Sequence, residues 1–313
     1  MLNFCQVSLS RDIPIILENY RSFKKIYKSF KTFVICPKNE IHFFKKKLDF
    51  TEFNLIDEDS IISFEDFSKI FEEISSSVKY QDLFRKRLRW YYQQVLKLSF
   101  AMDFINLNKE GIIIWDADTI ILKKIKFFKN DHSIRYGTLF EFHKSYFETN
   151  KSIIGEHPKY FISSLIQFIG LSVSECEFFN RKINFSNKQK KTSVIITKII
   201  LKNIFETHEN YNGSLFSEYE LIGISNYMFK KDKQKALFTL RNELNGKLTR
   251  LQIMLAKFLN VKHITYEHSH LNKDSQGMLE RKQKWISFIR ILIKDFVKFN
   301  LRNLKHNINF YYY

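Results

Sequence analysis

The chain has 313 residues, 44% of them hydrophobic and 16% aromatic, so it can bury a core, and its few prolines and glycines exclude long linkers. A formal charge of +18 leaves nucleic acid, lipid and phosphorylated substrates as partners to weigh, although abundant Lys, Ile, Asn and Phe also allow a compositional bias. Three cysteines without a CxxC pair argue against a disulfide framework or a zinc cluster and favour a reducing compartment.

The first sixty residues alternate between strand and helix patterns. Strands are predicted at residues 4–10, 31–36 and 53–56, and helices at 12–27 and 40–48. This alternation is typical of a parallel sheet with crossover helices. The N-terminus lacks the pattern of a secretion signal, and we expect one main domain without a membrane-spanning helix.

A long helix is predicted next, followed by a fully apolar strand. Apolar residues recur at three- and four-residue steps over residues 91–105, with Gln94 and Lys97 near the edge of the apolar face. Residues 111–115 are apolar throughout, the pattern of a central parallel strand covered on both faces. The strand ends in Asp116-Ala117-Asp118.

Asp116 and Asp118 lie where an open α/β sheet binds its ligands, outside the carboxyl end of a strand. Two carboxylates that lean toward the same point repel one another, and a divalent cation removes the repulsion. Oxygen ligands suit Mg²⁺ or Mn²⁺, which usually keep positions open for substrate phosphates. The pair therefore predicts a metal site for a diphosphate leaving group, and the alternative is a solvated strand-to-loop turn.

Three stretches together resemble one family in their order and spacing: residues 90–98, 114–119 and 216–223. The chain is similar to bacterial GT-A-type glycosyltransferases, and more narrowly to a group found among surface-polysaccharide enzymes that build lipopolysaccharide or capsule. The resemblance implies an α/β, GT-A-like (Rossmann-type) mostly parallel sheet flanked by helices over residues 1–275. It also implies transfer of a sugar from a nucleotide-sugar donor to a glycan or lipid-linked acceptor.

The resemblance suggests roles for individual residues. Asp116 would contact the donor ribose or the metal, Asp118 would hold the metal, and Gln94 and Lys97 would face the donor. Independently, an ammonium one helical turn from Gln94 could screen a diphosphate, although Lys97 could also be an exposed helix lysine. Glu218 is the candidate catalytic base, which would take the proton of the acceptor hydroxyl if the enzyme inverts the configuration of the sugar, or a sugar-hydroxyl contact.

Other positions near these motifs carry less information. Glu220 could merely be exposed, and Ile222 stands where the family often has an aromatic residue. A third metal ligand is often a histidine near the end of such domains, and residues 266–270 contain two candidates, His268 and His270, of which His268 is favoured. The alternative for His268 is an ordinary surface histidine.

The last residues, 276–313, are predicted to form a basic amphipathic helical tail. Trp285, Phe288, Ile291, Leu292, Phe296 and Phe299 recur at helical intervals, and lysines and arginines flank them. Such a helix can lie in the interface of an anionic membrane, or it can dock on the domain through its apolar face. The expected location is the cytoplasm, with peripheral attachment to the inner face of the cytoplasmic membrane as an open question.

Two other functions compete with a glycosyltransferase. A nucleic-acid-binding protein is suggested by the charge and by the basic run at residues 85–89, but no nucleic-acid motif occurs and the basic residues are spread along the chain. The second is a non-catalytic protein of the same fold in a glycan-assembly complex. The acidic triplet argues against it.

Overall fold

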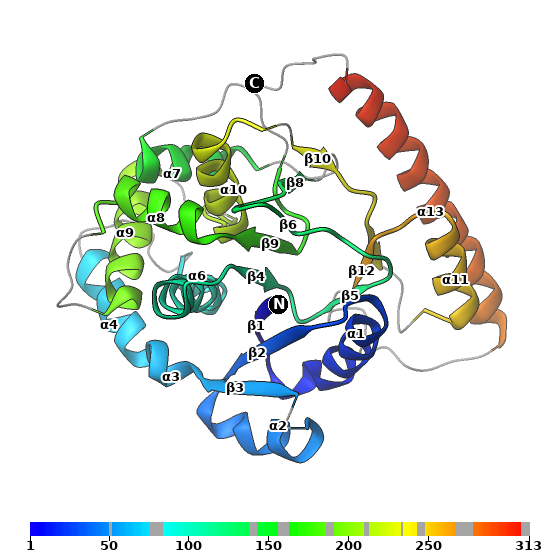
Figure 1. Cartoon of the computed structure of the whole chain (residues 1–313), viewed down its shortest axis with the longest axis horizontal. Coiled ribbons are helices and arrows are strands. Elements are labelled where there is room, and N and C mark those ends of the chain that lie inside the picture. The colour runs from blue at the N-terminus through cyan, green and yellow to red at the C-terminus, as the bar shows by residue number, and fades with distance from the viewer. Residues whose placement is uncertain are drawn as a thin grey trace.

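A computed structural model describes residues 1–49, 52–75, 84–137, 143–155, 163–185, 191–209, 213–232, 234–242, 248–266 and 278–307. Within them a central sheet is covered by helices on both faces (Figure 1). The predicted α/β class, a mostly parallel sheet flanked by helices, is confirmed.

The central sheet has the strand order β3-β2-β1-β4-β9. Its strands are β1 (Leu2–Val7), β2 (Phe30–Cys36), β3 (Phe53–Asp57), β4 (Ile112–Trp115) and β9 (Phe168–Leu171). The first four are parallel, and β9 pairs antiparallel with β4 at the edge. The three N-terminal strands predicted from the sequence are therefore confirmed, and α1 (Ile13–Ile26) and α2 (Ile41–Lys47) connect them as predicted.

Strand β4 is buried on both faces, as its continuous apolar run predicted. Ile112 and Ile114 pack into one core cluster with α6 (Leu88–Asn108), whereas Ile113 and Trp115 pack into a cluster on the other face. Helix α6 contacts both β1 and β4, and it includes the helix predicted at residues 91–105. Residues at the end of β4 and along α6 are thereby held at the same edge of the sheet.

The remaining elements surround this layer and are, in chain order, α3 (Glu58–Ile61), α4 (Phe64–Ser75), β5 (Thr119–Ile121), β6 (Phe128–Lys129), β7 (His132–Ser133), β8 (Tyr136–Gly137), α7 (Lys144–Ile154), α8 (Val173–Lys182), α9 (Thr192–Thr207), α10 (Glu218–Phe229), β10 (Lys235–Ala236), β11 (Leu240–Asn242), α11 (Arg250–Phe258), β12 (His263–Tyr266) and α13 (Met278–Asn307). A second, three-stranded sheet has the order β11-β12-β5.

Helix α13 docks on this second sheet. Phe288 and Leu292 are buried among side chains of β5, β11, β12 and α11, and Trp285, Ile291 and Phe299 pack against the same cluster. Docking through an apolar face, one of the two alternatives for the tail, therefore occurs. The outward face of α13 does not take part in this docking.

Among the described residues, no helix is both long enough and apolar enough to cross a lipid bilayer.

Trp115 offers a test of how much the end of β4 contributes to stability. Its ring is fully buried, stacks on Phe168 with centroids 5.3 Å apart, and donates a hydrogen bond from Nε1 to the Thr119 carbonyl at 2.9 Å. Trp115→Ala should lower the free energy of unfolding by about 3–5 kcal/mol, measured by urea denaturation. Leu107→Ala, at an exposed position, is the control and should change stability by less than about 0.5 kcal/mol. Equal stabilities would show that the ring is not a packing centre.

Candidate active site

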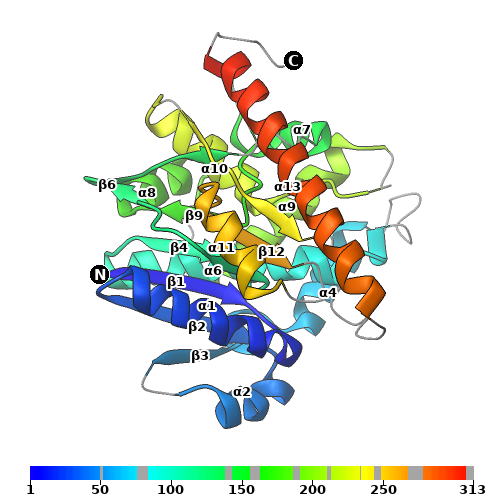
Figure 2. The same cartoon turned by 90° about the vertical axis from the view of Figure 1, so that its right-hand side faces the viewer.

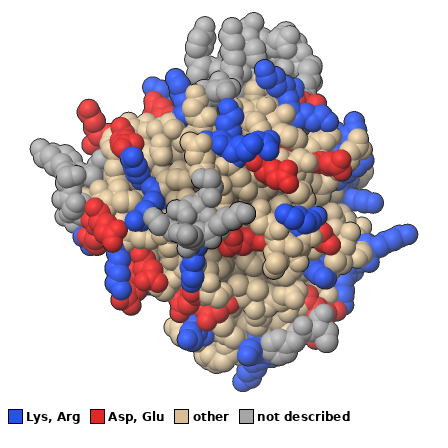
Figure 3. Space-filling view, turned by 60° about the vertical axis from the view of Figure 1, so that its left-hand side comes forward, with Lys and Arg blue, Asp and Glu red and all other residues tan. Residues whose placement is uncertain are grey.

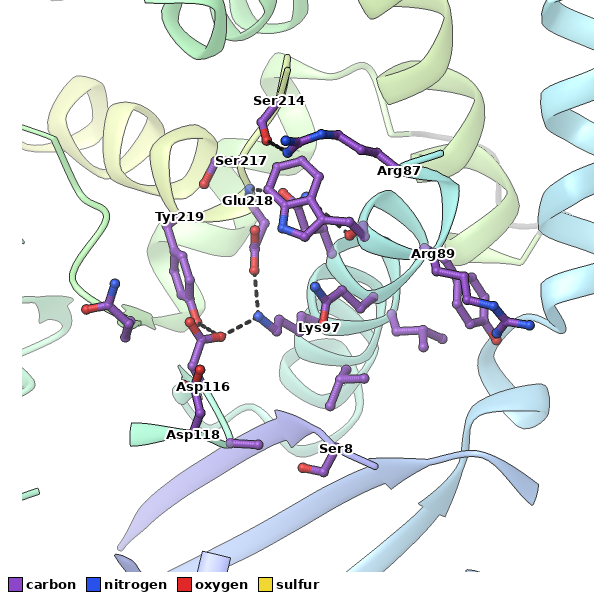
Figure 4. A pocket seen from close by; sticks show the side chains of 18 of the residues that line it. Ser8, Arg87, Arg89, Lys97, Asp116, Asp118, Ser214, Ser217, Glu218 and Tyr219 are labelled. Carbon is purple, nitrogen blue, oxygen red and sulfur yellow. Dashed lines mark hydrogen bonds and ion pairs between the residues drawn. The ribbon is translucent and has the colours of Figure 1, made fainter. Parts of the chain in front are cut away.

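A cavity of about 1100 Å³ opens at the carboxyl edge of the central sheet. Its walls come from the ends of β1 and β4 and from the facing sides of α6 and α10, and Asp116, Asp118, Lys97, Gln94 and Glu218 all line it (Figure 4). Four segments distant in the sequence therefore place their polar side chains around one space. The position agrees with the rule that α/β sheets bind ligands outside the carboxyl ends of their strands.

The turn that carries the two aspartates is tied to the neighbouring strands. The Asp116 amide donates to the Gln167 carbonyl at 2.9 Å, and the Tyr266 amide donates to the Asp118 carbonyl at 2.9 Å. Gln167 has a φ of 61°, a left-handed conformation that is uncommon outside glycine and points to a constrained backbone at the cavity wall. The Thr119 hydroxyl bonds Asp118 Oδ1 at 3.2 Å. Asp116 and Asp118 are therefore held by β12 and by the segment before β9.

Lys97 lies between two carboxylates. Its Nζ donates to Asp116 Oδ1 at 2.5 Å and to Glu218 Oε1 at 3.0 Å (Figure 4). The Tyr219 hydroxyl donates to the same Asp116 oxygen at 2.6 Å, and its ring centroid lies 5.1 Å from the ammonium. The side chains of Lys97 and Glu218 are 6% and 3% exposed, whereas that of Asp116 is 25% exposed. The cluster is therefore mostly buried, and its most exposed member, Asp116, faces the cavity.

The charges in this cluster follow from its burial. Burial lowers the pKa of Lys97, but the Asp116 and Glu218 carboxylates outweigh that effect and raise the pKa above its ordinary value. Burial raises the pKa of Glu218, and Lys97 offsets part of the rise. Burial and Asp116 raise the pKa of Tyr219 well above its ordinary value. Lys97 therefore stays a cation, and Tyr219 stays a hydroxyl donor, at neutral pH.

Glu218 is the first residue of α10, and its position is set from α6. The Glu218 amide donates to Gln94 Oε1 at 3.0 Å, so Gln94 contacts one of the first amides of this helix. Gln94 and Lys97, expected near the edge of a helix face, are both buried. The alternative of Lys97 as an exposed helix lysine is wrong, because two carboxylates from other elements neutralise it inside the protein.

Two further expectations concern Glu220 and His268. Glu220, which the sequence allowed to be exposed, is fully buried, and it accepts hydrogen bonds from the Ser163 hydroxyl and the Ser164 amide. An exposed position for Glu220 is wrong, because its carboxylate accepts hydrogen bonds from these polar groups of another segment inside the protein. His268 lies outside the described residues, so its role as a metal ligand stays a prediction.

Several cavity residues carried no clear signal in the sequence. Arg87 hydrogen-bonds the Ser214 hydroxyl, and Trp90 stacks loosely against Tyr146 at 6.4 Å between ring centroids. Arg87 belongs to the basic run at residues 85–89 that suggested nucleic acid, and Trp90 opens one of the motifs. Only their place at the cavity distinguishes them from other basic and aromatic residues.

The donor set around Asp116 and Asp118 fits a divalent cation in part. Both carboxylates line the same cavity, and both hydrogen bonds described above use Oδ1 of Asp116, which leaves Oδ2 as the oxygen with which it could ligate a metal. Among the described residues, no group of three or more His, Cys, Asp or Glu side chains is arranged to hold a metal ion. A cation at this position would take its remaining ligands from substrate phosphates, from water or from residues outside the described part of the chain.

Comparison with known proteins gives structural neighbours only. No family model and no curated protein sequence matches the chain. One neighbour is the galactosyltransferase LgtC, solved with donor and acceptor sugar analogues. The match covers 90% of this chain and 94% of the LgtC chain, at 10% identity and a TM-score of 0.42. The match to mouse xyloside xylosyltransferase 1 in its apo form covers 88% of this chain and 99% of that protein, at 11% identity and a TM-score of 0.38. At these TM-scores, function has to be inferred from the residues of the cavity itself.

Removing the central cation should destabilise the fold. Lys97→Met would leave Asp116 and Glu218 facing each other without a counter-charge, so the free energy of unfolding should fall by about 3–5 kcal/mol in urea denaturation. Lys97→Met combined with Glu218→Gln should recover part of that loss. Lys198→Met, which removes a half-exposed lysine paired with Glu73 at 3.7 Å, is the control and should cost less than about 1 kcal/mol. A Lys97→Met protein as stable as wild type would argue against the pairing.

A second carboxyl in the cavity wall is perturbed by its surroundings. Burial and the adjacent Asp59 carboxylate raise the pKa of Glu58 to about 7, and Arg89 offsets part of the rise. Because the folded protein binds this proton more tightly than the unfolded chain, stability decreases as the pH rises from about 4.5 to about 7. Above about pH 7, Glu58 is ionised in both the folded and the unfolded chain, so the loss of stability stays constant.

Glu58→Gln should therefore stabilise the protein in a pH-dependent manner. Above about pH 7 the variant should be more stable by about 1 kcal/mol, a value discounted for solvent screening, and the gain should shrink toward zero near pH 4.5. Urea denaturation across this range measures the difference. Glu65→Gln, at an exposed position of α4, is the control. A gain that is independent of pH would contradict the assigned cause.

Proposed function

We propose that this protein is a metal-assisted glycosyltransferase that transfers a sugar from a nucleotide-sugar donor to a glycan or lipid-linked acceptor. The observation that carries the proposal is the pair Asp116 and Asp118 at the end of the central strand, directed into a large cavity and backed by the buried Lys97. A cavity of about 1100 Å³ is slightly larger than the usual range for small-molecule sites, which fits a donor beside an acceptor.

In this proposal the two aspartates hold Mn²⁺ or Mg²⁺ against the donor diphosphate. Such an ion, when bound, would neutralise the charge that develops on the nucleoside diphosphate as the sugar departs. Lys97 and Tyr219 fix Asp116 through Oδ1, which orients its other oxygen before the donor arrives. Asp118 is held by its carbonyl and by Thr119, so both carboxylates are preorganised.

Glu218 is proposed to take the proton of the acceptor hydroxyl, or to bind a hydroxyl of the donor sugar. It lines the cavity on the opposite side of Lys97 from Asp116, and its pKa is raised by burial, which makes its carboxylate a better proton acceptor. Gln94 positions Glu218 through its backbone amide. We extend the proposal to the synthesis of bacterial lipopolysaccharide or capsule, where a lipid-linked acceptor would place the enzyme at the inner face of the cytoplasmic membrane.

The donor and the metal can be identified together. In a thermal-shift screen of UDP-, GDP-, CMP- and dTDP-sugars, one donor should raise the melting temperature in the presence of Mn²⁺, because a ligand at about a hundred times its Kd adds about 2.7 kcal/mol of stability. Asp118→Asn should abolish this metal-dependent shift and reduce turnover of that donor by at least about 10²-fold. Asp66→Asn, at an exposed position of α4, is the matched control and should behave as wild type.

Glu218→Gln separates the proposed base from donor binding. This variant should retain the donor-dependent shift and lose turnover by about 10²–10⁴-fold, as expected when a general base is removed. If no nucleotide sugar binds, or if Asp118→Asn retains full metal-dependent turnover, the proposed function is wrong. Salt-sensitive binding to DNA that nucleotide sugars do not compete for would favour the nucleic-acid alternative instead.

A further inference from the structure

The outer side of the molecule at α11 and α13 exposes large apolar side chains on two neighbouring helices. The helices lie together at the rim in Figure 1 and face the viewer in Figure 2, and both contribute to the same buried cluster. Large exposed apolar surfaces on two adjacent elements commonly mark a binding surface. We refer to the exposed apolar residues of these two helices as the outer apolar surface.

Helix α13 has two apolar stripes, one of which faces away from the protein. The docked stripe is centred on Phe288 and Leu292, as described above. The second stripe consists of exposed residues: Ile286, Ile289, Ile293, Phe296, Val297 and Leu301. They are 39–57% exposed, and they recur at helical spacing beside the docked stripe. Phe296 lies at the border of the two stripes, because its ring also packs against Phe238 with centroids 5.7 Å apart. Docking on the domain therefore uses only part of the apolar surface of this helix.

Helix α11 adds a matching stripe. Leu251, Met254 and Phe258 are spaced by three and four residues, so they share one face, and they are 65%, 64% and 83% exposed. The opposite face carries Gln252 and Ala256, which are buried. The exposed face of α11 is thus as apolar as the faces that are normally buried in a helical protein.

The charges around the outer apolar surface are predominantly positive. The sequence of α13 contains eight lysines and arginines and two acidic residues, and that of α11 contains Arg250 and Lys257 and no acidic residue. Arg290 and Lys294 are exposed beside the second stripe. On the side of the molecule at α4 and α9, by contrast, basic and acidic side chains are interspersed (Figure 3). Apolar and basic groups are therefore combined at α11 and α13.

We propose that the outer apolar surface binds an anionic lipid bilayer, with the apolar side chains of α11 and α13 inserted among the acyl chains at the interface and the flanking lysines and arginines against the headgroups. A bilayer matches both features, because it offers apolar chains beneath a layer of negative charge. A second copy of the chain would bring two strongly basic faces together, which electrostatic repulsion opposes. Binding of the bilayer at this surface does not require the sugar-transfer activity.

Flotation with lipid vesicles tests this surface in the full-length protein. The wild-type protein should float with phosphatidylcholine vesicles that contain phosphatidylglycerol and not with phosphatidylcholine alone, and the bound fraction should decrease between about 0.15 M and about 0.5 M NaCl. Phe258→Ser combined with Ile293→Ser should reduce the partition coefficient by at least about tenfold. Arg290→Glu combined with Lys294→Glu should reduce it by a comparable factor.

A matched control distinguishes this surface from general stickiness. Phe43→Ser combined with Leu107→Ser removes two exposed apolar side chains from α2 and the end of α6 and should float as wild type does. All six substituted residues are exposed, so circular dichroism should show each variant folded. Absence of binding to anionic vesicles, or undiminished binding by Phe258→Ser/Ile293→Ser, would overturn the proposal. So would a dimer in light scattering that this double variant dissociates, because a second copy would then cover the surface.

Discussion

The candidate site depends on one buried cation that joins two distant carboxylates. Lys97 comes from the helix beneath the sheet edge, Asp116 from the end of the central strand and Glu218 from the start of α10. The buried Glu218 carboxylate beside the partly exposed Asp116 carboxylate would be costly without a counter-charge, and the ammonium makes their proximity compatible with folding. The same contacts that stabilise this region also aim Asp116 at the cavity, so stability and the proposed chemistry share their residues.

The arrangement divides positive charge between the protein and the proposed ligand. Lys97 neutralises the buried side of the cluster, while Asp116 and Asp118, which both line the cavity, are the proposed ligands of a cation that arrives with the donor. A lysine with a raised pKa is a permanent charge at physiological pH and does not itself report pH. A dependence of stability on pH in this region is therefore expected from Glu58 rather than from Lys97.

The excess positive charge is distributed unevenly over the surface of the folded protein. Over α4 and α9 it is interspersed with acidic side chains, and over α11 and α13 it accompanies exposed apolar residues. The cavity also carries Arg87 and Arg89, from the run that first suggested nucleic acid. The excess of charge is thus divided between two separate places, the candidate substrate cavity and the proposed membrane-binding surface.

The sequence by itself determined the alternation of strands and helices, the central apolar strand and the two aspartates that follow it, because periodicity and the position of a strand end are local properties. Only the tertiary structure decided that Lys97 pairs with Glu218, 121 residues away, that Gln167 and Tyr266 hold the aspartate turn, and that Glu220 is buried. These contacts join segments whose spacing along the chain carries no information about their distance in space. Helical periodicity likewise predicted the apolar stripe of the C-terminal helix, yet could not tell which of its apolar residues would dock and which would face outward, since that depends on what the rest of the chain places beside it.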